Sequence, residues 1–294
     1  MATIANRIKS GKGNRRWRWF ANHLASWLAV ASTLLVVAPL IAIFVDLVYK
    51  GASSLNWNFF TKVPAPVGEM GGGMANAIVG SGVLLGLASA IGVPIGIGAG
   101  VYLSEYGRGT KLSTLVRFTA DVLNGVPSIV MGIAVYALIV APEKGFSALA
   151  GGVVLGIMMI PTVARTTEEM LLMVPHSIRE AALGLGVPSW RSMLSITLKT
   201  ALPGVITGCM LAFARIAGET APLLFTAFGN PFVSANLNQP IEALPLQIYV
   251  YALSPYDEWH RLAWAGALVL IVLIVVSVAL VRFVTTRGVL KGAS

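Results

Sequence analysis

An arginine and a glutamate stand four residues apart in a stretch of the chain that is otherwise apolar. The stretch covers about residues 202–228, with Arg215 near its middle and Glu219 one helical turn later. As a helix it is long enough to cross a bilayer, and a charge at the centre of such a helix costs from about 2.5 to more than about 10 kcal/mol. A guanidinium offers a planar fork of permanent donors that matches the oxygens of an anion. The pattern therefore favours a pathway for an oxyanion.

Two roles for Arg215 and Glu219 fit their spacing. On one helical face they could pair and neutralise each other inside a helix bundle, although an arginine before a glutamate is the poorer order for helix stability. In the other role, Arg215 faces a water-lined passage and meets the anion transiently, while Glu219 competes for the guanidinium so that the anion is released. Arg165 is a further candidate, either for the cytoplasmic exit of that passage or as an interfacial anchor.

The elements that must position these side chains are membrane helices. Hydrophobic residues make up 56% of the chain and charged residues 11%, and about 20 apolar residues in a helix cross the core of a bilayer. With the stretch around Arg215 as the fifth span, six are expected, so the predicted fold class is an all-α membrane protein with six transmembrane helices. The other five spans cover approximately residues 24–48, 76–103, 115–140, 147–164 and 262–284.

Two of these spans carry residues that predict how they pack. The second contains Gly92, Gly96 and Gly100 at a spacing of four, which lets helix backbones approach closely. In the third, Pro127 removes a backbone donor, so we expect a bend there. The bend either lines a pathway or only shapes the bundle.

The basic residues orient the chain across the membrane. Sixteen of the 21 lysines and arginines fall on one side of the expected spans and four on the other, with Arg215 inside a span. Because cytoplasmic loops carry the excess of basic residues, both termini are expected in the cytoplasm, and the net charge of +9 requires no nucleic-acid partner. The expected organisation is a basic tail over residues 1–22 and a membrane domain over 23–294.

Two external segments are expected, at about residues 49–75 and 229–260. The second contains four prolines and several aromatic residues. It either holds an interfacial helix and a docking surface for an outside partner, or it is a plain extracellular loop with aromatic residues at the membrane–water interface.

The cytoplasmic loop over about residues 165–200 carries start and stop signals for short helices. Ser177 and Glu180 form an S-x-x-E capping box, and Gly186 suits the position just after the helix end. Pro188 suits the first turn of a second helix. The predicted pair of short helices between spans four and five makes a compact projection. It either fits a groove on a soluble partner or only connects the two spans.

The same loop resembles the EAA loop of ABC-importer permeases. Lys199 departs from the family pattern, which has a proline at this position. In that family the loop supplies a coupling helix that seats in an ATPase subunit, and the resemblance implies the same role here. The residues concerned are Ser177, Glu180, Ala181, Ala182 and Gly186.

Four runs of the chain carry a second likeness. They are Arg-Thr-Thr-Glu-Glu-Met from Arg165, Gly-Val-Pro-Ser from Gly125, Ala-Arg-Ile-Ala-Gly-Glu-Thr-Ala-Pro-Leu-Leu-Phe-Thr-Ala from Ala214, and Ser-Pro-Tyr-Asp-Glu-Trp from Ser254. Through these runs, from about residue 76 to the end, the chain is similar to the A-type permease subunits of the Pst phosphate importers. The resemblance implies import of inorganic phosphate across the cytoplasmic (inner) membrane. It also implies a second permease subunit of C type, a dimer of ATPase subunits and an external phosphate-binding protein as partners.

The chain is expected to be a transport subunit and not an enzyme. It contains no G-x-x-x-x-G-K-[ST] phosphate loop, so ATP and Mg²⁺ are expected in a partner subunit, and no cofactor or metal is expected in this chain. Three other functions stay open. They are a permease for another oxyanion such as sulfate or molybdate, a secondary transporter that works alone, and a membrane sensor scaffold that uses the loop to signal.

Overall fold

The computed structural model describes residues 15–69, 71–107 and 109–291. Within these residues the regular structure is helical, apart from two isolated β-bridges. Five helices are long and apolar enough to cross a membrane, and a bent pair of helices supplies a sixth crossing when it is counted as one. The predicted all-α membrane fold with six spans is thereby confirmed.

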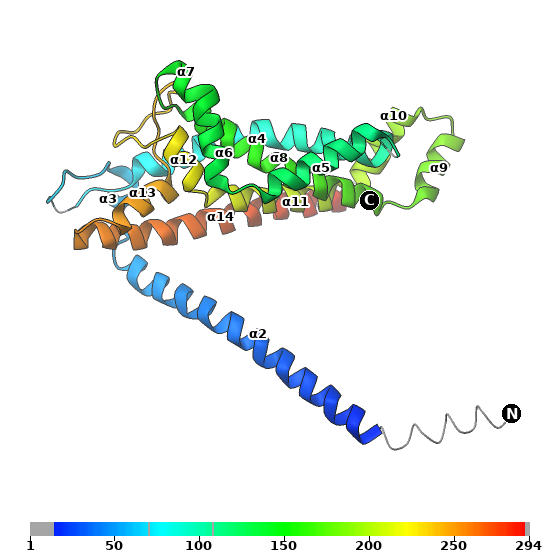
Figure 1. The fold of residues 1–294 in the computed structure, drawn as a ribbon, viewed down its shortest axis with the longest axis horizontal. Helices are drawn as coiled ribbons and strands as arrows, with labels where there is room; N and C mark the ends of the chain where they lie inside the picture. The colour runs from blue at the N-terminus through cyan, green and yellow to red at the C-terminus, as the bar shows by residue number, and fades with distance from the viewer. Residues whose placement is uncertain (1–14, 70, 108, 292–294) are drawn as a thin grey trace. The chain divides into compact units, whose positions relative to one another are not determined.

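The chain forms two compact units, Met1–Lys50 and Gly51–Ser294. The described part of the first unit lies in α2 (Arg15–Ala52), a continuous helix drawn in blue in Figure 1. This helix contains the first expected span. Of the expected tail over residues 1–22, residues 15–22 are already helical, and residues 1–14 lie outside the described residues.

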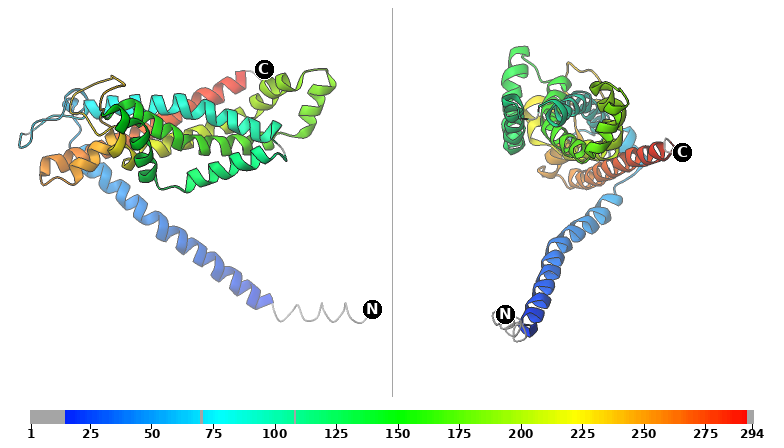
Figure 2. Two further views of the ribbon diagram at one scale, coloured as in Figure 1. Left: turned by 45° about the horizontal axis from the view of Figure 1, so that its top comes forward. Right: turned by 90° about the vertical axis from the view of Figure 1, so that its right-hand side faces the viewer.

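The second unit contains the remaining spans. The second span is α4 (Ala75–Val101), extended by a π-helical turn, η1 (Tyr102–Tyr106). The fourth is α8 (Ala148–Leu172), and the sixth is α14 (Asp257–Lys291). The fifth begins at α10 (Ser189–Ser192) and runs through η3 (Met193–Thr197) into α11 (Leu198–Ala217). In Figures 1 and 2, α4, α8 and α11 lie along one another, and α14 packs beside α11.

Three glycines of α4 lie in its contact with α8, the most extensive helix contact in this unit. A Cβ atom on Gly92 would lie 2.8 Å from Cβ of Met159, and one on Gly96 would lie 2.6 Å from Cβ of Val163. Gly100 meets Thr167 of α8 in the same way. Only a residue without a side chain permits this approach, so the expected close packing of span two is confirmed.

The third span is bent. It consists of α5 (Lys111–Gly125) and α6 (Ser128–Val135), followed by η2 (Tyr136–Val140) and α7 (Ala141–Glu143). The two parts meet at an angle of 105°. Val126 has an extended backbone, as expected before a proline, and Pro127 is the N-cap of α6. The bend predicted at Pro127 is therefore confirmed.

The two segments expected to be external each contain a short helix. The first holds α3 (Trp57–Thr61), and the second holds α13 (Leu244–Ala252), which packs on α14. Phe59 of α3 is fully buried in a small apolar core that also contains Met74, Tyr251 and Leu262. The second external segment is thus a folded element that includes a helix.

Candidate functional site

The stretch around Arg215 is broken into two helices. The helix α11 ends at Ala217, and α12 (Ala221–Thr226) begins four residues later. Gly218 is the C-cap of α11, and Pro222 has no N–H with which to continue the helix onto the carbonyl of Gly218. The prediction that Arg215 and Glu219 share one helical face is therefore wrong, because Glu219 lies past the helix end. No described contact pairs the two side chains.

Arg215 nevertheless lies at mid-depth in the bundle. The helices α11 and α8 run antiparallel, since Gly204 meets Met170 and Gly208 meets Thr166. The same offset brings Arg215 level with about Met159, which is near the middle of α8. The other half of the crossing is completed by α12, whose last residue, Thr226, accepts a hydrogen bond at its carbonyl from the Ser147 N–H at 3.0 Å.

The guanidinium of Arg215 sits in the last turn of α11 on an exposed face of this chain. The helix dipole favours a cation at that end. Among the described residues, Arg215 has neither a hydrogen-bond partner nor an ion-pair partner. Glu219 is half-buried at the break. A cation at this depth, on a face open for contact, is arranged to meet an anion or another subunit.

Arg165, the predicted exit residue, belongs to a charge cluster that joins α5 to α8. One of its nitrogens lies 3.1 Å from Asp121 of α5, and another lies 3.6 Å from Glu168, one turn along α8. Glu168 also accepts from Arg117 of α5 at 2.8 Å. The Glu168 side chain is only 5% exposed, so its two arginines supply the positive charge that a buried carboxylate needs.

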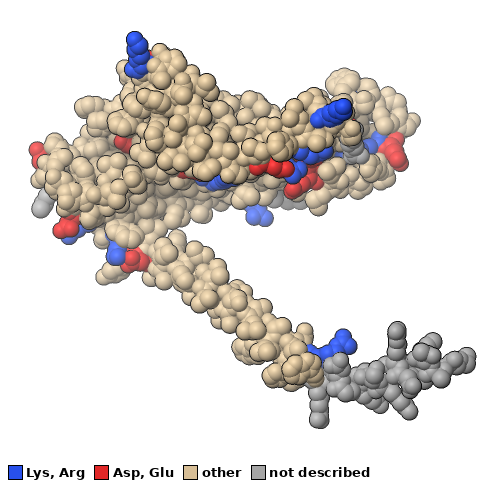
Figure 3. Space-filling view, viewed as in Figure 1, with Lys and Arg blue, Asp and Glu red and all other residues tan. Residues whose placement is uncertain are grey.

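The cluster is neutral as a whole, and the sequence reasoning missed its buried member. Arg165 and Asp121 are 44 residues apart in the chain, and Arg117 and Glu168 are 51 residues apart. Contacts between residues so far apart cannot be predicted from this sequence alone. The only local signals are the one-turn spacings of Arg117 to Asp121 and of Arg165 to Glu168. Figure 3 shows how acidic and basic side chains gather toward this end of the second unit, near α5 and α9 (His176–Gly184).

The helix α9 matches the expected coupling helix but starts differently. Its N-cap is Pro175, and Ser177 is already the second helical residue with no capping hydrogen bond. The predicted capping box is therefore wrong, because a capping side chain must come from a non-helical residue. Glu180 and Ala181 are exposed, whereas Ala182 is buried.

The end of α9 follows the prediction. Gly186 has φ of +77° just past the C-cap, and its N–H donates to the Leu183 carbonyl at 2.9 Å. The next N–H, of Val187, donates to Ala182 at 3.1 Å, which completes a Schellman motif. Pro188 is the N-cap of α10 and so precedes its first turn by one residue. The second short helix, α10, is continuous with span five through η3.

An arginine fixes α9 to the bundle. Arg179 lies 2.8 Å from Glu105 of η1 and donates to the Leu171 carbonyl of α8 at 2.6 Å. Both charged side chains of this pair are largely buried, at 12% and 17% exposure. No local pattern in the sequence predicts this contact. Through it, α9 is held against the ends of α4 and α8.

At the end of the bundle opposite α9, Glu242 is a half-buried carboxylate held by backbone donors. Its Oε1 accepts from the Ala243 N–H at 3.1 Å, and Gly229 passes so close that a Cβ there would lie 2.8 Å from Oε2. Burial raises the pKa of Glu242 to about 7, against the hydrogen bonds from the Ala243 and Asn230 backbones, which lower it.

Comparisons with known proteins agree on one family. The family described as "Binding-protein-dependent transport system inner membrane component" matches residues 92–287. A protein of Yersinia pestis named phosphate transport system permease protein PstA is 45% identical over 287 residues, covering 98% of this chain and 97% of its own. The protein of the same name from Xylella fastidiosa (strain Temecula1) is 49% identical, over 78% of this chain and 79% of its own length.

A more distant relative and a solved structure extend the likeness. PstA 1 of Mycobacterium tuberculosis (strain CDC 1551) is 34% identical over 92% of this chain and 91% of its own. The inward-facing MetNI methionine ABC transporter, in its CY5 native crystal form, shares the fold with a TM-score of 0.57 at 22% identity. That likeness covers 74% of this chain and 96% of the other. The chain belongs to the family of binding-protein-dependent transport system inner membrane components.

Proposed function

We propose that this chain is the permease subunit through which an ATP-driven importer passes inorganic phosphate across the cytoplasmic membrane into the cell. The observation that carries the proposal is Arg215, an exposed guanidinium at mid-depth with no hydrogen-bond or ion-pair partner among the described residues. We infer that the anion is phosphate from relatives at 45% and 49% identity, which are named phosphate transport system permease proteins. A guanidinium fork binds the oxygens of phosphate and keeps its charge at every physiological pH.

Arg215 acts as a transient contact in this scheme. Phosphate carries one or two negative charges and does not enter an apolar core unaided, so a fixed cation midway lowers the barrier. The contact between Arg215 and the anion must also be weak enough to release the anion. Glu219 stays in the proposal as the competitor for the guanidinium, reached in a state in which the backbone of the break at Gly218 to Thr220 has changed. Arg165 remains the candidate at the exit, where Asp121 and Glu168 already balance its charge.

The energy for transport comes from another subunit in this scheme. The exposed side of α9, with Glu180 and Ala181, seats in a groove of an ATPase subunit, one of a pair that binds ATP and Mg²⁺. Arg179 then passes the displacement of α9 to η1 and α8, whose residues it contacts. A second permease subunit covers the exposed face of Arg215, and an external binding protein delivers phosphate at the end that carries α13. Both termini lie in the cytoplasm.

The test is uptake by the assembled complex in proteoliposomes. Arg215→Gln should lower the rate of labelled phosphate uptake by at least about tenfold, which corresponds to about 1.4 kcal/mol of barrier. Arg261→Gln is the matched control, because that arginine lies on α14 with a side chain 71% exposed and only a long pair to Glu258. Co-purification of the ATPase subunits shows that each variant assembles. Uptake by Arg215→Gln at the control rate would discard the proposed role.

The same assay separates phosphate from other oxyanions. An excess of unlabelled phosphate should suppress uptake of the label, and equal concentrations of sulfate or molybdate should leave it unchanged. If sulfate or molybdate suppressed uptake as strongly as phosphate, the substrate assignment would fail while the permease assignment stood.

A further inference from the structure

Polar contacts join α5 to α8 at successive turns from the end near α9 toward mid-depth. They are Arg117 with Glu168 at 2.8 Å, Asp121 with Arg165 at 3.1 Å, and Asn124 with Thr162 at 3.4 Å. The first two are ion pairs, whereas in the third the Thr162 hydroxyl donates to Oδ1 of Asn124. The contacts lengthen and lose their charge toward mid-depth, so the innermost is the weakest of the three.

The innermost contact lies between the depth of Arg165 and that of Arg215. Thr162 precedes Arg165 by about one turn of α8. In the other direction, it is less than one turn from about Met159, with which Arg215 is level, and this corresponds to about 4.5 Å of rise. An anion that moves from Arg215 to Arg165 therefore passes the depth of Asn124 and Thr162.

The same contact lies on the side of α8 that α11 approaches. Gly208 of α11 meets Thr166, one turn from Thr162 on α8. Arg215 follows Gly208 by two helical turns, so both residues are on one side of α11. Arg215 and Thr162 are thus placed where α11 and α8 face each other, at neighbouring depths.

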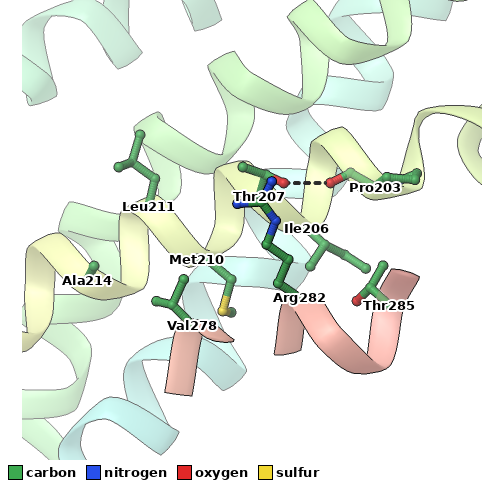
Figure 4. A pocket seen from close by; sticks show the side chains of 9 residues that line it. All are labelled: Pro203, Ile206, Thr207, Met210, Leu211, Ala214, Val278, Arg282 and Thr285. Carbon is green, nitrogen blue, oxygen red and sulfur yellow. Dashed lines mark hydrogen bonds between the residues drawn. The ribbon is translucent and has the colours of Figure 1, made fainter. Parts of the chain in front are cut away.

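Thr162 differs from nearby threonines in the acceptor of its hydroxyl. Thr166 donates to the Thr162 carbonyl at 2.9 Å. Thr207, in a groove beside α14, donates to the Pro203 carbonyl at 2.8 Å, as the dashed line in Figure 4 shows. Such a bond to the carbonyl four residues back is common for threonine in a helix. The Thr162 hydroxyl instead reaches Oδ1 of Asn124 on α5, and this bond turns the NH₂ of the amide away from Thr162.

The NH₂ of Asn124 is a donor without an acceptor among the described residues. Asn124 is half-buried, and the side chains of Asp121 and Arg165 beside it are 56% and 37% exposed. An unpaired amide donor is costly in an apolar medium, and polar side chains within membrane spans face the bundle interior or a water-filled cavity. A passage for a polar solute along this side of α5 and α8 accounts for all three side chains.

We propose that the NH₂ of Asn124 binds the phosphate anion after it leaves Arg215 and before it reaches Arg165, and that Thr162 positions this amide. This role rests on the proposed function and extends the same pathway. An amide donates to a phosphate oxygen but carries no charge, so it binds the anion more weakly than either arginine does. A neutral donor between two cations keeps the anion hydrogen-bonded during the transfer and does not trap it.

The experiment measures uptake of labelled inorganic phosphate by the assembled complex in proteoliposomes. Asn124→Leu keeps the approximate size of the side chain and removes its donors, so it should lower the rate about tenfold, the effect of one hydrogen bond to a charged group. Asn124→Asp replaces the donor by a negative charge and should lower the rate at least as much. Thr119→Val is the matched control on α5 and should keep the wild-type rate, because the exposed Thr119 hydroxyl donates to the Leu115 carbonyl of its own helix at 2.9 Å.

The positioning role of Thr162 has a readout of its own. Thr162→Val should lower uptake about three- to tenfold, the effect of one neutral hydrogen bond, whereas Thr162→Ser keeps the hydroxyl and should retain most of the rate. In a chain that already carries Asn124→Leu, Thr162→Val should cause no further loss, because the hydroxyl acts through the amide. A role in packing alone would add its own loss in both backgrounds.

The outcomes separate this inference from the proposed function. Uptake by Asn124→Leu at the rate of Thr119→Val, with Arg215→Gln still impaired, would overturn this inference alone. An added loss from Thr162→Val in the Asn124→Leu background would overturn the positioning role. Failure of the Asn124→Leu chain to co-purify with its partner subunits would assign the amide to a subunit contact and contradict the proposal. Uptake by Arg215→Gln at the control rate would remove the proposed function, and this inference with it.

Discussion

The glycines of α4 differ in what surrounds them, and this difference predicts opposite effects of the same substitution. A Cβ on Gly96 would lie 2.6 Å from Cβ and 2.7 Å from Cγ1 of Val163, and 3.1 Å from the carbonyl oxygen of Ile160. Two residues later, a Cβ on Gly98 would have nothing within 4 Å. Both positions are inside one helix, so replacing either by alanine changes the backbone preference equally.

The magnitudes follow from two terms. Alanine in place of glycine in a helix interior favours the helix by about 1 kcal/mol. Overpacking at a tight contact costs about 1–3 kcal/mol, and Val163 cannot swing away because its branched Cβ is fixed to the α8 backbone. We therefore expect Gly98→Ala to be neutral or stabilising by up to about 1 kcal/mol, and Gly96→Ala to be less stable than Gly98→Ala by about 1–3 kcal/mol.

The assay is thermal unfolding of the purified assembly in detergent, followed by circular dichroism and by loss of the monodisperse peak. A gap of about 2–4 °C is expected for each kcal/mol. The reasoning would be refuted if Gly96→Ala and Gly98→Ala melted together.

Three further predictions concern charges and a turn. Glu168→Gln leaves two arginines without their shared carboxylate and should lower the free energy of unfolding by about 2 kcal/mol, less than the about 3–5 kcal/mol of a fully buried pair. Asp121→Asn changes a side chain that is 56% exposed and should lower it by less than about 1 kcal/mol. Glu242 has a folded pKa of about 7 above its ordinary 4.5, so the folded state holds a proton that the unfolded state releases between these values. Its contribution to stability should fall as pH rises through that window, and Glu242→Gln should flatten this part of the pH profile of unfolding. Gly186→Ala forces a residue with a side chain to φ of +77° and should speed amide exchange in α9 about five- to thirtyfold, while Gly184→Ala should not.

Much of the fold could be predicted because each signal was local. Apolar length located the spans, Pro127 located the bend, and Gly186 located the end of α9. In each case a residue restricts its own backbone or that of its neighbour, so no information about the rest of the fold is needed.

The errors arose where two local signals competed. The stretch over residues 202–228 is continuous in hydropathy, but Gly218 and Pro222 at a spacing of four end one helix before the next begins. Ser177 fits the capping pattern, yet Pro175 is the N-cap, so the helix starts two residues earlier than this pattern predicts. Partners such as Arg117 with Glu168 and Arg179 with Glu105 come from distant segments, so only the folded chain brings them together.

The interlocked pair of α4 and α8 determines where this protein can change shape. At Gly92, Gly96 and Gly100 the α4 backbone lies directly against side chains of α8, so we expect the two helices to move as one body. We then expect rearrangement at the joints Val126 to Pro127 and Gly218 to Thr220. These joints belong to touching elements, since a Cβ on Gly132 of α6 would lie 2.7 Å from Cα of Pro222 in α12. We therefore expect a rotation at one joint to move the other joint, which lies close to Arg215 in the chain.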